Sequence, residues 1–398
     1  MRRVLVVGLA RSGEAARAAL EERGVEVVAA DRQLGNDGDL TLLDGVDVVV
    51  KSPGVPGEAP LPEAARIRGI PVWSEVELGA HLLPNPLVGV TGTNGKTTTA
   101  ELLGAIFRAA GRPVEVAGNV GRALTSLRPQ PDAWLVCELS SFQLEDVHEL
   151  RPRVAVLLNL EPDHLDRHRT FGAYRAAKLR VFENQRPEDT AVVPRGFGEI
   201  PGAARRVEFG ADDDLPAEPL LPGPHNRENA AAATAAARAA GIDDTAVAAA
   251  LRSFPGVAHR LELVAERAGV RYVNDSKATN TAAARRALAS YGAPLHLILG
   301  GSLKGERFDE LAGAVAAANV RTAYLIGEAA DPLAVALGYA GVPFRHCGTL
   351  ERAVDEAARA AEPGHIVLLS PACASYDQFR DFEHRGEEFR RLVENLAG

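Results

Sequence analysis

Short apolar runs alternate with longer stretches rich in Ala, Arg, Glu and Leu along almost the whole chain. A short apolar run is typical of a strand that is buried on both faces, and the longer stretches have a helical composition. The alternation predicts the α/β class, with parallel sheets covered by helices. The expected strands span residues 4–7, 25–30, 46–50, 87–90, 133–137, 154–158, 191–193, 270–273, 295–299, 323–326 and 366–369.

Two proline-containing breaks divide this series. Residues 81–86 include Pro84 and Pro86, and residues 253–256 have the sequence Ser-Phe-Pro-Gly. Proline ends a preceding helix and stiffens a linker. We therefore predict three Rossmann-like βα domains, formed by residues 1–86, 87–256 and 257–398.

Composition narrows the class of protein. The chain has 398 residues, of which 46% are hydrophobic and 24% charged, as in ordinary soluble globular proteins. The net charge of −9 argues against a nucleic-acid binder, which usually carries a basic excess. Cys137, Cys347 and Cys373 are far apart and lack CxxC spacing. They predict neither a disulfide framework nor a cysteine zinc site, and a reducing cytosol is the default.

The chain shows no sign of membrane insertion. No apolar stretch reaches the length of about 18 residues that a spanning helix needs. The apolar run near the N-terminus is interrupted at Gly8, Arg11 and Glu14, so it does not resemble a signal peptide. We expect a cytoplasmic protein.

The segment GTNGKTTT at residues 92–99 directly follows the strand predicted at 87–90 and precedes a predicted helix at 100–110. Strand, glycine loop, Lys-Thr and helix are the parts of a phosphate-binding P-loop. Gly92 and Gly95 permit a tight turn, Lys96 brings positive charge to phosphates, and the Thr97 hydroxyl can ligate Mg²⁺. The pattern departs from the general template because Val90 replaces its first glycine, and the alternative is an ordinary turn.

Acidic and histidine residues follow two further strands of the same predicted sheet. Glu138 comes after the strand ending at Cys137, and His164 lies beyond the strand ending at Leu158. Ligands bind beyond the carboxyl ends of parallel strands, so both side chains belong to the edge that carries the P-loop and are candidate Mg²⁺ ligands. Each alone has an inert alternative, a solvated carboxylate or a hydrogen-bonded surface histidine.

Two other residues leave alternatives open. His164 and His168 have the spacing of a zinc pair, but no third ligand is evident. Lys178 lies in Tyr-Arg-Ala-Ala-Lys at residues 174–178, and position alone predicts a solvated helix lysine.

Taken together, these segments resemble the Mur ligase family of ATP-dependent amide-bond ligases, over nearly the whole chain. The segments that carry the resemblance are GTNGKTTT (92–99), ELSSFQLE (138–145), EPDHLDRH (161–168), YRAAKLRVFEN (174–184), GPHNRENAAAA (223–233), HRLE (259–262), NDSKATN (274–280) and LLSPACASYDQFRDFEHRG (368–386). NDSKATN and SPACASYDQF favour the members that use D-glutamate.

The resemblance implies a ligase that adds D-glutamate to UDP-N-acetylmuramoyl-L-alanine through an acyl phosphate, for peptidoglycan precursor synthesis. It implies a UDP-substrate domain, a central P-loop ATPase domain and an amino-acid domain, two Mg²⁺ ions, a carbamylated Lys178 and a monomer. Asn119 would lie near the reacting groups. The implied ATP contacts are Gly92, Thr93, Asn94, Gly95, Lys96, Thr97, Thr98, Asn226, Asn229, Arg260 and Asp275. The implied metal ligands are Thr97, Glu138, His164 and Lys178. The implied D-glutamate contacts are Lys277, Thr279, Lys304, Ser375 and Phe382.

The first domain carries a second glycine loop. Residues 8–13 resemble a dinucleotide-binding loop in which Ala10 replaces the middle glycine, and Asp31 ends the next strand. On this motif alone, a nicotinamide-dependent oxidoreductase is an alternative function. The family resemblance instead implies a site for UDP. Its contacts would be Arg11 and Ser12 at the diphosphate, and Asp31, Arg32, Ser52, Pro53 and Gly54 at the uracil end.

Other readings of the same residues remain open at this point. A sibling ligase could use a different amino acid or folate, and a noncatalytic regulator could bind nucleotide without turnover. Two departures affect the glutamate pocket. Ser302 stands where an Asp often precedes the pocket lysine by two positions, and Tyr376 stands where an apolar residue is frequent.

Overall fold

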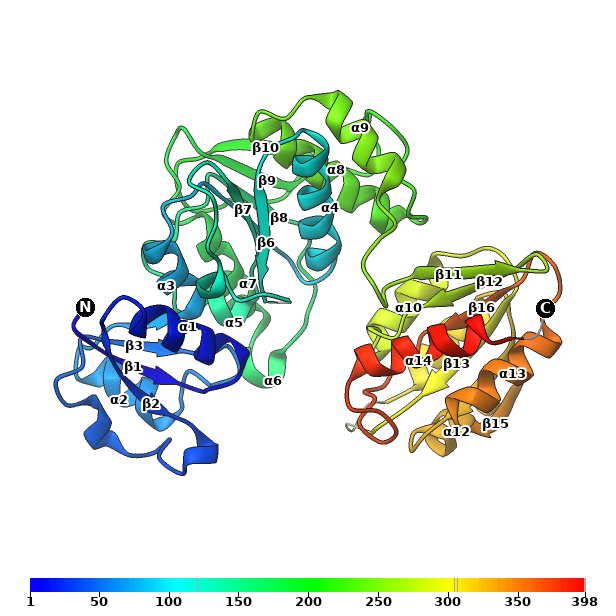
Figure 1. Ribbon diagram of the computed structural model, residues 1–398. Coiled ribbons are helices and arrows are strands. Elements are labelled where there is room, and N and C mark those ends of the chain that lie inside the picture. The colour runs from blue at the N-terminus through cyan, green and yellow to red at the C-terminus, as the bar shows by residue number, and fades with distance from the viewer. Residues whose placement is uncertain (120, 304, 306, 397–398) are drawn as a thin grey trace. The chain divides into compact units, whose positions relative to one another are not determined.

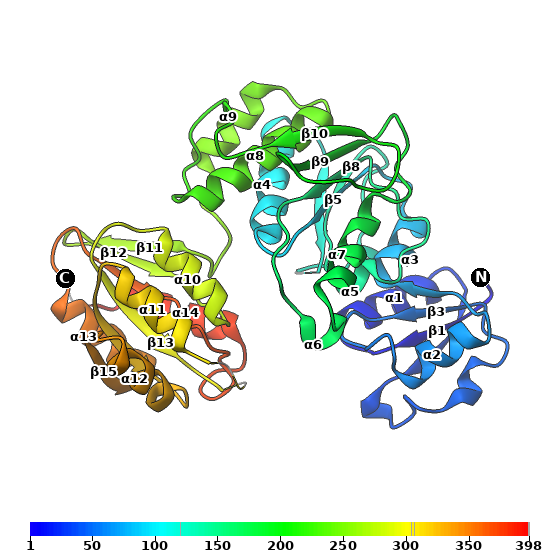
Figure 2. The same ribbon diagram turned by 180° about the vertical axis from the view of Figure 1, so that it is seen from behind.

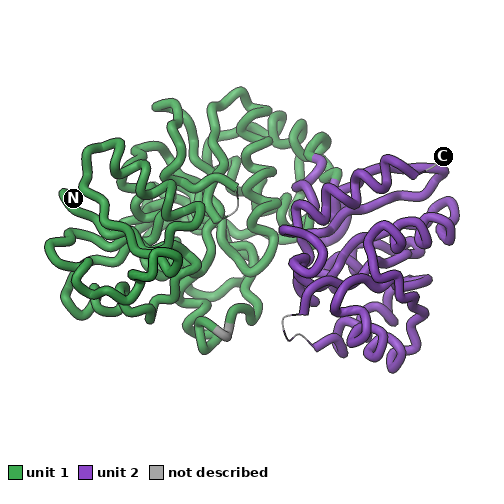
Figure 3. The backbone as a smooth tube through the Cα atoms, turned by 60° about the horizontal axis from the view of Figure 1, so that its bottom comes forward, with its two compact units in different colours: residues 1–220, 225–254 green, residues 221–224, 255–398 purple. Residues whose placement is uncertain are grey.

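The structure, a computed structural model, describes residues 1–119, 121–303, 305 and 307–396. The chain divides into two compact units, one of residues 1–220 and 225–254, the other of residues 221–224 and 255–398 (Figure 3). Helices cover both faces of the sheets in each unit (Figures 1 and 2). The predicted α/β class with three sheets dominated by parallel strands is confirmed.

The first unit begins with a parallel sheet of strand order β2-β1-β3-β4. One face packs against α1 and α3 through residues such as Val6, Leu20 and Leu78, and the other face packs against α2. The elements are β1 (Arg3–Val7), α1 (Arg11–Glu21), β2 (Glu26–Ala30), η1 (Arg32–Leu34), η2 (Leu40–Leu43), β3 (Val48–Lys51), α2 (Pro60–Ile67), β4 (Val72–Ser74) and α3 (Glu75–Leu82).

The second sheet of this unit has the order β10-β9-β8-β5-β7-β6 and is parallel throughout. Helices α4, α8 and α9 cover one face, and α5, α7 and η3 pack on the other. The elements are β5 (Leu87–Thr91), α4 (Lys96–Ala109), β6 (Val114–Gly118), η3 (Leu124–Ser126), β7 (Trp134–Glu138), α5 (Ser141–Leu144), β8 (Val154–Leu157), α6 (Leu165–His168), α7 (Phe171–Leu179), η4 (Arg180–Phe182), β9 (Thr190–Pro194), β10 (Arg205–Phe209), α8 (Pro224–Ala239) and α9 (Asp244–Ser253).

Helix α3 joins these two sheets. Its Leu78 belongs to the core of the first sheet, whereas Val76 belongs to a core of the second. Two buried carboxylates anchor the helix: Glu75 accepts hydrogen bonds from the backbone and hydroxyl of Thr125, and Glu77 accepts two backbone N–H bonds from residues 149–150. Burial raises the pKa of Glu75. Because one helix serves both cores, the two sheets form one compact unit, and the domain boundary at residue 86 stays a prediction.

The second unit has the strand order β11-β12-β16-β13-β14-β15. All its pairs are parallel except that of β11 with β12, which is antiparallel because only a short turn at Ala268 and Gly269 joins these two strands. Helices α10, α11 and α12 cover one face, and α13 and α14 the other. The elements are β11 (Glu262–Arg267), β12 (Val270–Asn274), α10 (Thr281–Ala289), β13 (Leu295–Gly300), α11 (Asp309–Ala317), β14 (Val320–Ile326), α12 (Ala330–Tyr339), β15 (Phe344–Gly348), α13 (Leu350–Ala360), β16 (Ile366–Leu369) and α14 (Phe382–Glu394).

In the part of the chain that the structure describes, no helix is both long enough and apolar enough to cross a membrane.

Helix α1 depends on a close backbone approach at Gly13. A Cβ atom at this position would lie 1.8 Å from the carbonyl oxygen of Gly8. We predict that Gly13→Ala lowers the stability of the first unit by about 1–3 kcal/mol, because backbone atoms must shift to relieve the overlap. Gly172→Ala is the matched control, since Gly172 also lies in the first turn of a helix and a Cβ there would meet only the Thr170 hydroxyl at 3.9 Å. Equal unfolding midpoints for the two variants in urea would contradict this account.

Candidate active site

The predicted P-loop connects β5 to α4 and has the strained backbone that its glycines allow. Gly92 and Gly95 have φ angles of 148° and 84°. A Cβ at Gly95 would lie 2.2 Å from Oδ1 of Asn229, so α8 touches the loop at a point where only glycine fits. The Asn94 N–H donates to Oδ1 of Asn159 at 2.9 Å, which fixes the loop to the segment after β8.

Lys96 folds back over this loop from the first turn of α4. Its Nζ donates to the carbonyl oxygens of Gly92 at 3.0 Å and Thr93 at 2.9 Å. Thr97 and Thr98 follow it in the same turn and are buried. The side chains that the P-loop motif predicts are therefore brought together at the amino end of one helix.

Lys178 approaches the same loop from α7. Its side chain is buried, with 2% of its surface exposed, and its Nζ donates to the Gly92 carbonyl oxygen at 2.8 Å. Burial, together with the neighbouring charge of Lys96, lowers the pKa of Lys178 to about 6. The prediction of a solvated lysine from position alone is wrong, because α7 packs this side chain onto the loop.

Glu138 ends β7 at the same edge of the sheet and is also buried. Asn119 contacts it twice: its backbone N–H donates to the Glu138 carbonyl oxygen at 2.9 Å and its Nδ2 donates to Oε1 at 3.1 Å. The structure therefore pairs these two predicted site residues directly.

His164 lies in an aromatic group beyond β8. Its ring centroid is 4.9 Å from that of Phe142 and 6.4 Å from that of Tyr174, and its side chain is about half exposed. Its φ angle of 51° places it in the left-handed region, where a side chain is strained. His168 is buried instead, with Nε2 at 2.9 Å from the Ser141 hydroxyl. Among the residues that the structure describes, no group of three possible ligands completes a zinc site with the two histidines.

Tyr174 and Thr93 form a contact that the sequence analysis did not assign. The Tyr174 hydroxyl donates to Oγ1 of Thr93 at 3.0 Å, and Thr93 in turn bonds the backbone of Glu161. Burial raises the pKa of Tyr174 to about 12. The spacing of four residues between Tyr174 and Lys178 on one helix was the signal available in the sequence.

A cavity of about 510 Å³ opens at the carboxyl edge of the first sheet. Asp31, Arg32 and Gly54 of the predicted UDP contacts line it, together with Val55 and Glu58. Two other predicted contacts bond nearby backbone: the Ser52 hydroxyl donates to the Gly8 carbonyl, and Arg11 donates to the Gly121 carbonyl. Ser12 lies in the first turn of α1, and the Pro53 carbonyl accepts a hydrogen bond from Arg167.

Asp31 closes the glycine loop beside this cavity. Its carboxylate accepts the N–H of Leu9 at 2.7 Å and of Gln33 at 2.8 Å, and these bonds lower its pKa. The carboxylate thus organises the turn itself, a role different from the ribose contact that the nicotinamide alternative requires.

Residues of the second unit gather at the carboxyl ends of β12 and β16. Asp275 is buried, accepts the Ser370 hydroxyl at 2.7 Å, and has its pKa raised to about 7 by burial. Lys277, Thr279 and Ser375 lie in the loops that follow.

Arg385 ties these loops together. Its buried guanidinium donates to the carbonyl oxygens of Ser276, Cys373 and Ala374, and the Ser276 hydroxyl donates to the carbonyl oxygen of Phe382. Of the other predicted residues, Arg260 belongs to this unit, Asn226 and Asn229 are buried on α8 of the first unit, and Lys304 lies outside the described residues.

Ser302 and Tyr376, the two residues that differ from the family pattern, lie in this unit. Ser302 is paired with Asp377, whose backbone N–H donates to the serine hydroxyl at 2.8 Å and whose carboxylate also accepts the Glu328 N–H. Asp377 thus brings a carboxylate to the place where the sequence lacks one. Tyr376 is 71% exposed.

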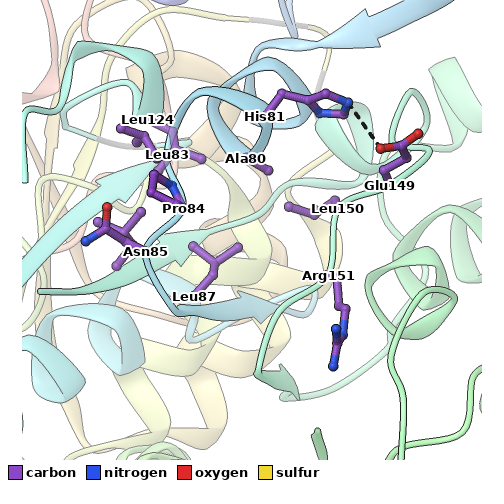
Figure 4. Close-up of a pocket in the computed structure, with 11 residues that line it drawn as sticks. Ala80, His81, Leu83, Pro84, Asn85, Leu87, Leu124, Glu149, Leu150 and Arg151 are labelled. Carbon is purple, nitrogen blue, oxygen red and sulfur yellow. Dashed lines mark ion pairs between the residues drawn. The ribbon is translucent and has the colours of Figure 1, made fainter. Parts of the chain in front are cut away.

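A second cavity, of about 280 Å³, lies at the amino ends of β5 and β7, at the opposite edge from the P-loop (Figure 4). On its wall, Nε2 of His81 lies 3.3 Å from the Glu149 carboxylate, and Leu83, Leu124 and Leu150 contribute apolar surface. None of the predicted site residues lines it.

Comparison with known proteins places this geometry in a family. A model of the Mur ligase middle domain matches residues 90–198, and a model of the Mur ligase glutamate ligase domain matches residues 259–373. The chain is 43% identical to the UDP-N-acetylmuramoylalanine–D-glutamate ligase of Pelotomaculum thermopropionicum, covering 99% of this chain and 98% of the relative. It belongs to the Mur ligase family. The ligase of the same name from Sphingopyxis alaskensis is 44% identical over 100% of this chain and 98% of its own.

Solved Mur ligases share the fold. The UDP-N-acetylmuramate–alanine ligase of Thermotoga maritima matches with a TM-score of 0.63 and 18% identity, over 99% of this chain and 100% of that one. The MurF ligase of the same organism, solved in complex with ADP, also has a TM-score of 0.63 and 18% identity, over 99% of this chain and 95% of that one.

The donor set of this Mur ligase suits Mg²⁺. Among residues 1–119, 121–303, 305 and 307–396, no three His, Cys, Asp or Glu side chains are grouped so that they could hold a metal. Mg²⁺ usually takes only one or two protein carboxylates and completes its shell with phosphates and water. A buried Glu138 beside a phosphate loop fits that requirement, with Thr97 as a further candidate.

We predict a pH-dependent contribution of Asp275 to stability. Its folded pKa of about 7 exceeds the ordinary 3.8, so its stabilising contribution is complete below the unfolded pKa and is lost as pH rises through the folded pKa. The free energy of unfolding of the wild type minus that of Asp275→Asn should therefore decrease by about 1–3 kcal/mol from pH 5 to pH 8. In Asp39→Asn, the control, the difference should stay constant, because hydrogen bonds from Thr41 lower the pKa of Asp39 below the ordinary 3.8. A constant difference for both variants would contradict the buried environment of Asp275.

Proposed function

We propose that this Mur ligase is an ATP-dependent enzyme that joins D-glutamate to UDP-N-acetylmuramoyl-L-alanine in peptidoglycan precursor synthesis. The observation that carries the proposal is that Lys96 and Lys178 both donate to the Gly92 carbonyl oxygen of the phosphate loop. The pKa of Lys178 there is lowered to about 6. The relatives named as D-glutamate ligases support the choice of amino acid. We further propose that the protein is a cytoplasmic monomer.

The reaction must activate a carboxylate. A carboxylate is a poor electrophile because of its charge and resonance, so the γ-phosphoryl group of ATP is transferred to the carboxylate of the L-alanine unit, giving an acyl phosphate and ADP. The amine of D-glutamate attacks the acyl carbon, and phosphate leaves as the amide bond forms. Positioning and charge neutralisation supply most of the catalysis in such transfers.

Lys96 is the proposed phosphate-binding cation. It lies at the amino end of α4, where the helix dipole also favours an anion. In leaving the carbonyls of Gly92 and Thr93 for the nucleotide, its ammonium would bring a full charge to the transferred group.

Lys178 is the proposed site of carbamylation. With a pKa of about 6, most of its amine is neutral at pH 7 and can add to CO₂, forming an N–C bond and releasing a proton. The product is anionic, so a residue that would repel a metal as an ammonium could bind one as a carbamate. We propose Thr97, Glu138, His164 and this carbamate as metal ligands; bound Mg²⁺ would neutralise charge on the phosphates.

The other predicted site residues are proposed to bind the substrates. The cavity of 510 Å³ beside Asp31, Arg32 and Gly54 is the proposed site for the UDP part of the substrate. Lys277, Thr279, Ser375 and Phe382 are proposed for D-glutamate, with Lys304. Asn226, Asn229, Arg260 and Asp275 are proposed for the nucleoside of ATP, and Asn119 for the reacting groups.

A substrate panel tests the proposal. The protein is incubated with ATP, Mg²⁺ and UDP-N-acetylmuramoyl-L-alanine in the presence of single D- and L-amino acids, and the amide product is measured by mass spectrometry. We expect product with D-glutamate and one ADP for each amide formed. Product with another amino acid only would assign a sibling activity, and ATP binding without product in any mixture would contradict the proposal.

Lys96→Met should lower kcat by at least about 100-fold, because the cation at the transferred phosphoryl group is lost. The control is Arg108→Met, at the exposed carboxyl end of the same helix α4, which should keep wild-type kcat. Steady-state ADP release measures both variants, and circular dichroism checks their fold. Equal kcat for Lys96→Met and the control would remove Lys96 from the mechanism.

A further inference from the structure

Arg167 connects the two sheets of the first unit. It lies on the short helix α6, beyond β8 of the second sheet, and its side chain is 16% exposed. Its Nη1 donates to the carbonyl oxygen of Pro53 at 2.9 Å, and its Nη2 donates to that of Val55 at 2.6 Å. Both carbonyls belong to the loop that follows β3 of the first sheet, so one guanidinium holds this loop from the other sheet.

The flat face of the guanidinium contacts Phe142, whose ring in turn contacts the proposed metal ligand His164. The guanidinium Cζ lies 4.3 Å from the ring centroid of Phe142. That ring packs against His164 at 4.9 Å and against His168 at 5.3 Å. An unbroken series of contacts therefore runs from His164 through Phe142 and Arg167 to the backbone at Pro53 and Val55.

The held loop forms part of the wall of the 510 Å³ cavity. Gly54 and Val55 line that cavity. Val55 also packs against the glycine turn, because a Cβ at Gly8 would lie 2.7 Å from its Cγ2. The Val55 carbonyl accepts a second hydrogen bond, at 3.2 Å, from Lys51, a buried lysine that pairs with Asp146 of the second sheet. Arg167, from the half of the unit that holds the second sheet, and Lys51, through its ion pair with Asp146 in that half, thus fix the shape of a cavity at the first sheet.

We propose that Arg167 is a positioning residue that holds residues 53–55 in the conformation that completes the nucleotide cavity, and so makes binding of the UDP substrate depend on the placement of the His164 segment. The inference rests on the proposed function, because that function supplies the nucleoside diphosphate. Arg167 touches no reacting atom in this scheme and acts through the loop.

The chemistry of the contact requires arginine. The planar guanidinium offers two N–H donors in a fixed fork, which suits two carbonyls two residues apart, and its flat face stacks on an aromatic ring. A lysine would present a point charge that can bond one of the carbonyls and stacks less well. Arg167→Lys should therefore keep the charge and lose most of the positioning.

Binding of UDP to the full chain tests the inference by calorimetry. We expect Arg167→Met to weaken UDP binding about tenfold, equivalent to about 1.4 kcal/mol, and Arg167→Lys to recover only part of that loss. In steady-state assays KM for the UDP substrate should rise while KM for ATP stays unchanged. The control is Arg175→Met, since Arg175 also stacks on a phenylalanine, Phe197, and bonds a carbonyl, that of Glu199, but makes these contacts within the second sheet's half of the unit. It should bind UDP within about twofold of wild type.

The outcomes separate the inference from the proposed function. Failure of the wild type to bind UDP would count against the proposed UDP substrate, whatever Arg167 does. Wild-type binding of UDP with equal binding by Arg167→Met and Arg167→Lys would overturn the positioning role. Parallel loss of UDP and ATP binding in both variants would also overturn it, because it would indicate a general structural role.

Discussion

The carbonyl oxygen of Gly92 accepts hydrogen bonds from two lysines, Lys96 at 3.0 Å and Lys178 at 2.8 Å. Two ammonium groups at one buried oxygen repel each other, and burial penalises the charge of each. Lys178 is the more enclosed of the two, and burial together with the charge of Lys96 lowers its pKa. β5, α4 and α7 meet at this carbonyl, and the lowered pKa leaves the Lys178 amine mostly neutral at pH 7.

Two further sets of contacts in the first unit stabilise the region around the Gly92 carbonyl. Tyr174 fixes α7 to the phosphate loop through the Thr93 hydroxyl, one helical turn from Lys178. Arg167 and the buried pair of Lys51 and Asp146 connect the same region to the 510 Å³ cavity of the first sheet. In the second unit Arg385 performs a comparable task, since it holds together the loops that carry the proposed amino-acid contacts.

The interior strands could be predicted from the sequence because strands buried on both faces are continuous apolar runs, as at 87–90 and 366–369. The strands β4, β6, β10, β11 and β15 could not, since each lies at the edge of its sheet and most carry polar residues. The phosphate loop was predictable because its glycines and the Lys-Thr pair form one contiguous motif between a strand and a helix. The burial of Lys178 and the contacts of Arg167 were not, since they join residues 86 and 112–114 positions apart, and helix periodicity says nothing about such pairs.

The titration of Lys178 tests the central claim most directly. The chain contains five lysines (Lys51, Lys96, Lys178, Lys277 and Lys304), so their side-chain signals can be resolved by NMR after selective labelling. In buffer free of CO₂, Lys178 should titrate with a pKa of about 6, and Lys96→Met should raise that pKa while burial keeps it below the ordinary 10.5. A pKa near 10.5 for Lys178 in the wild type would contradict the account.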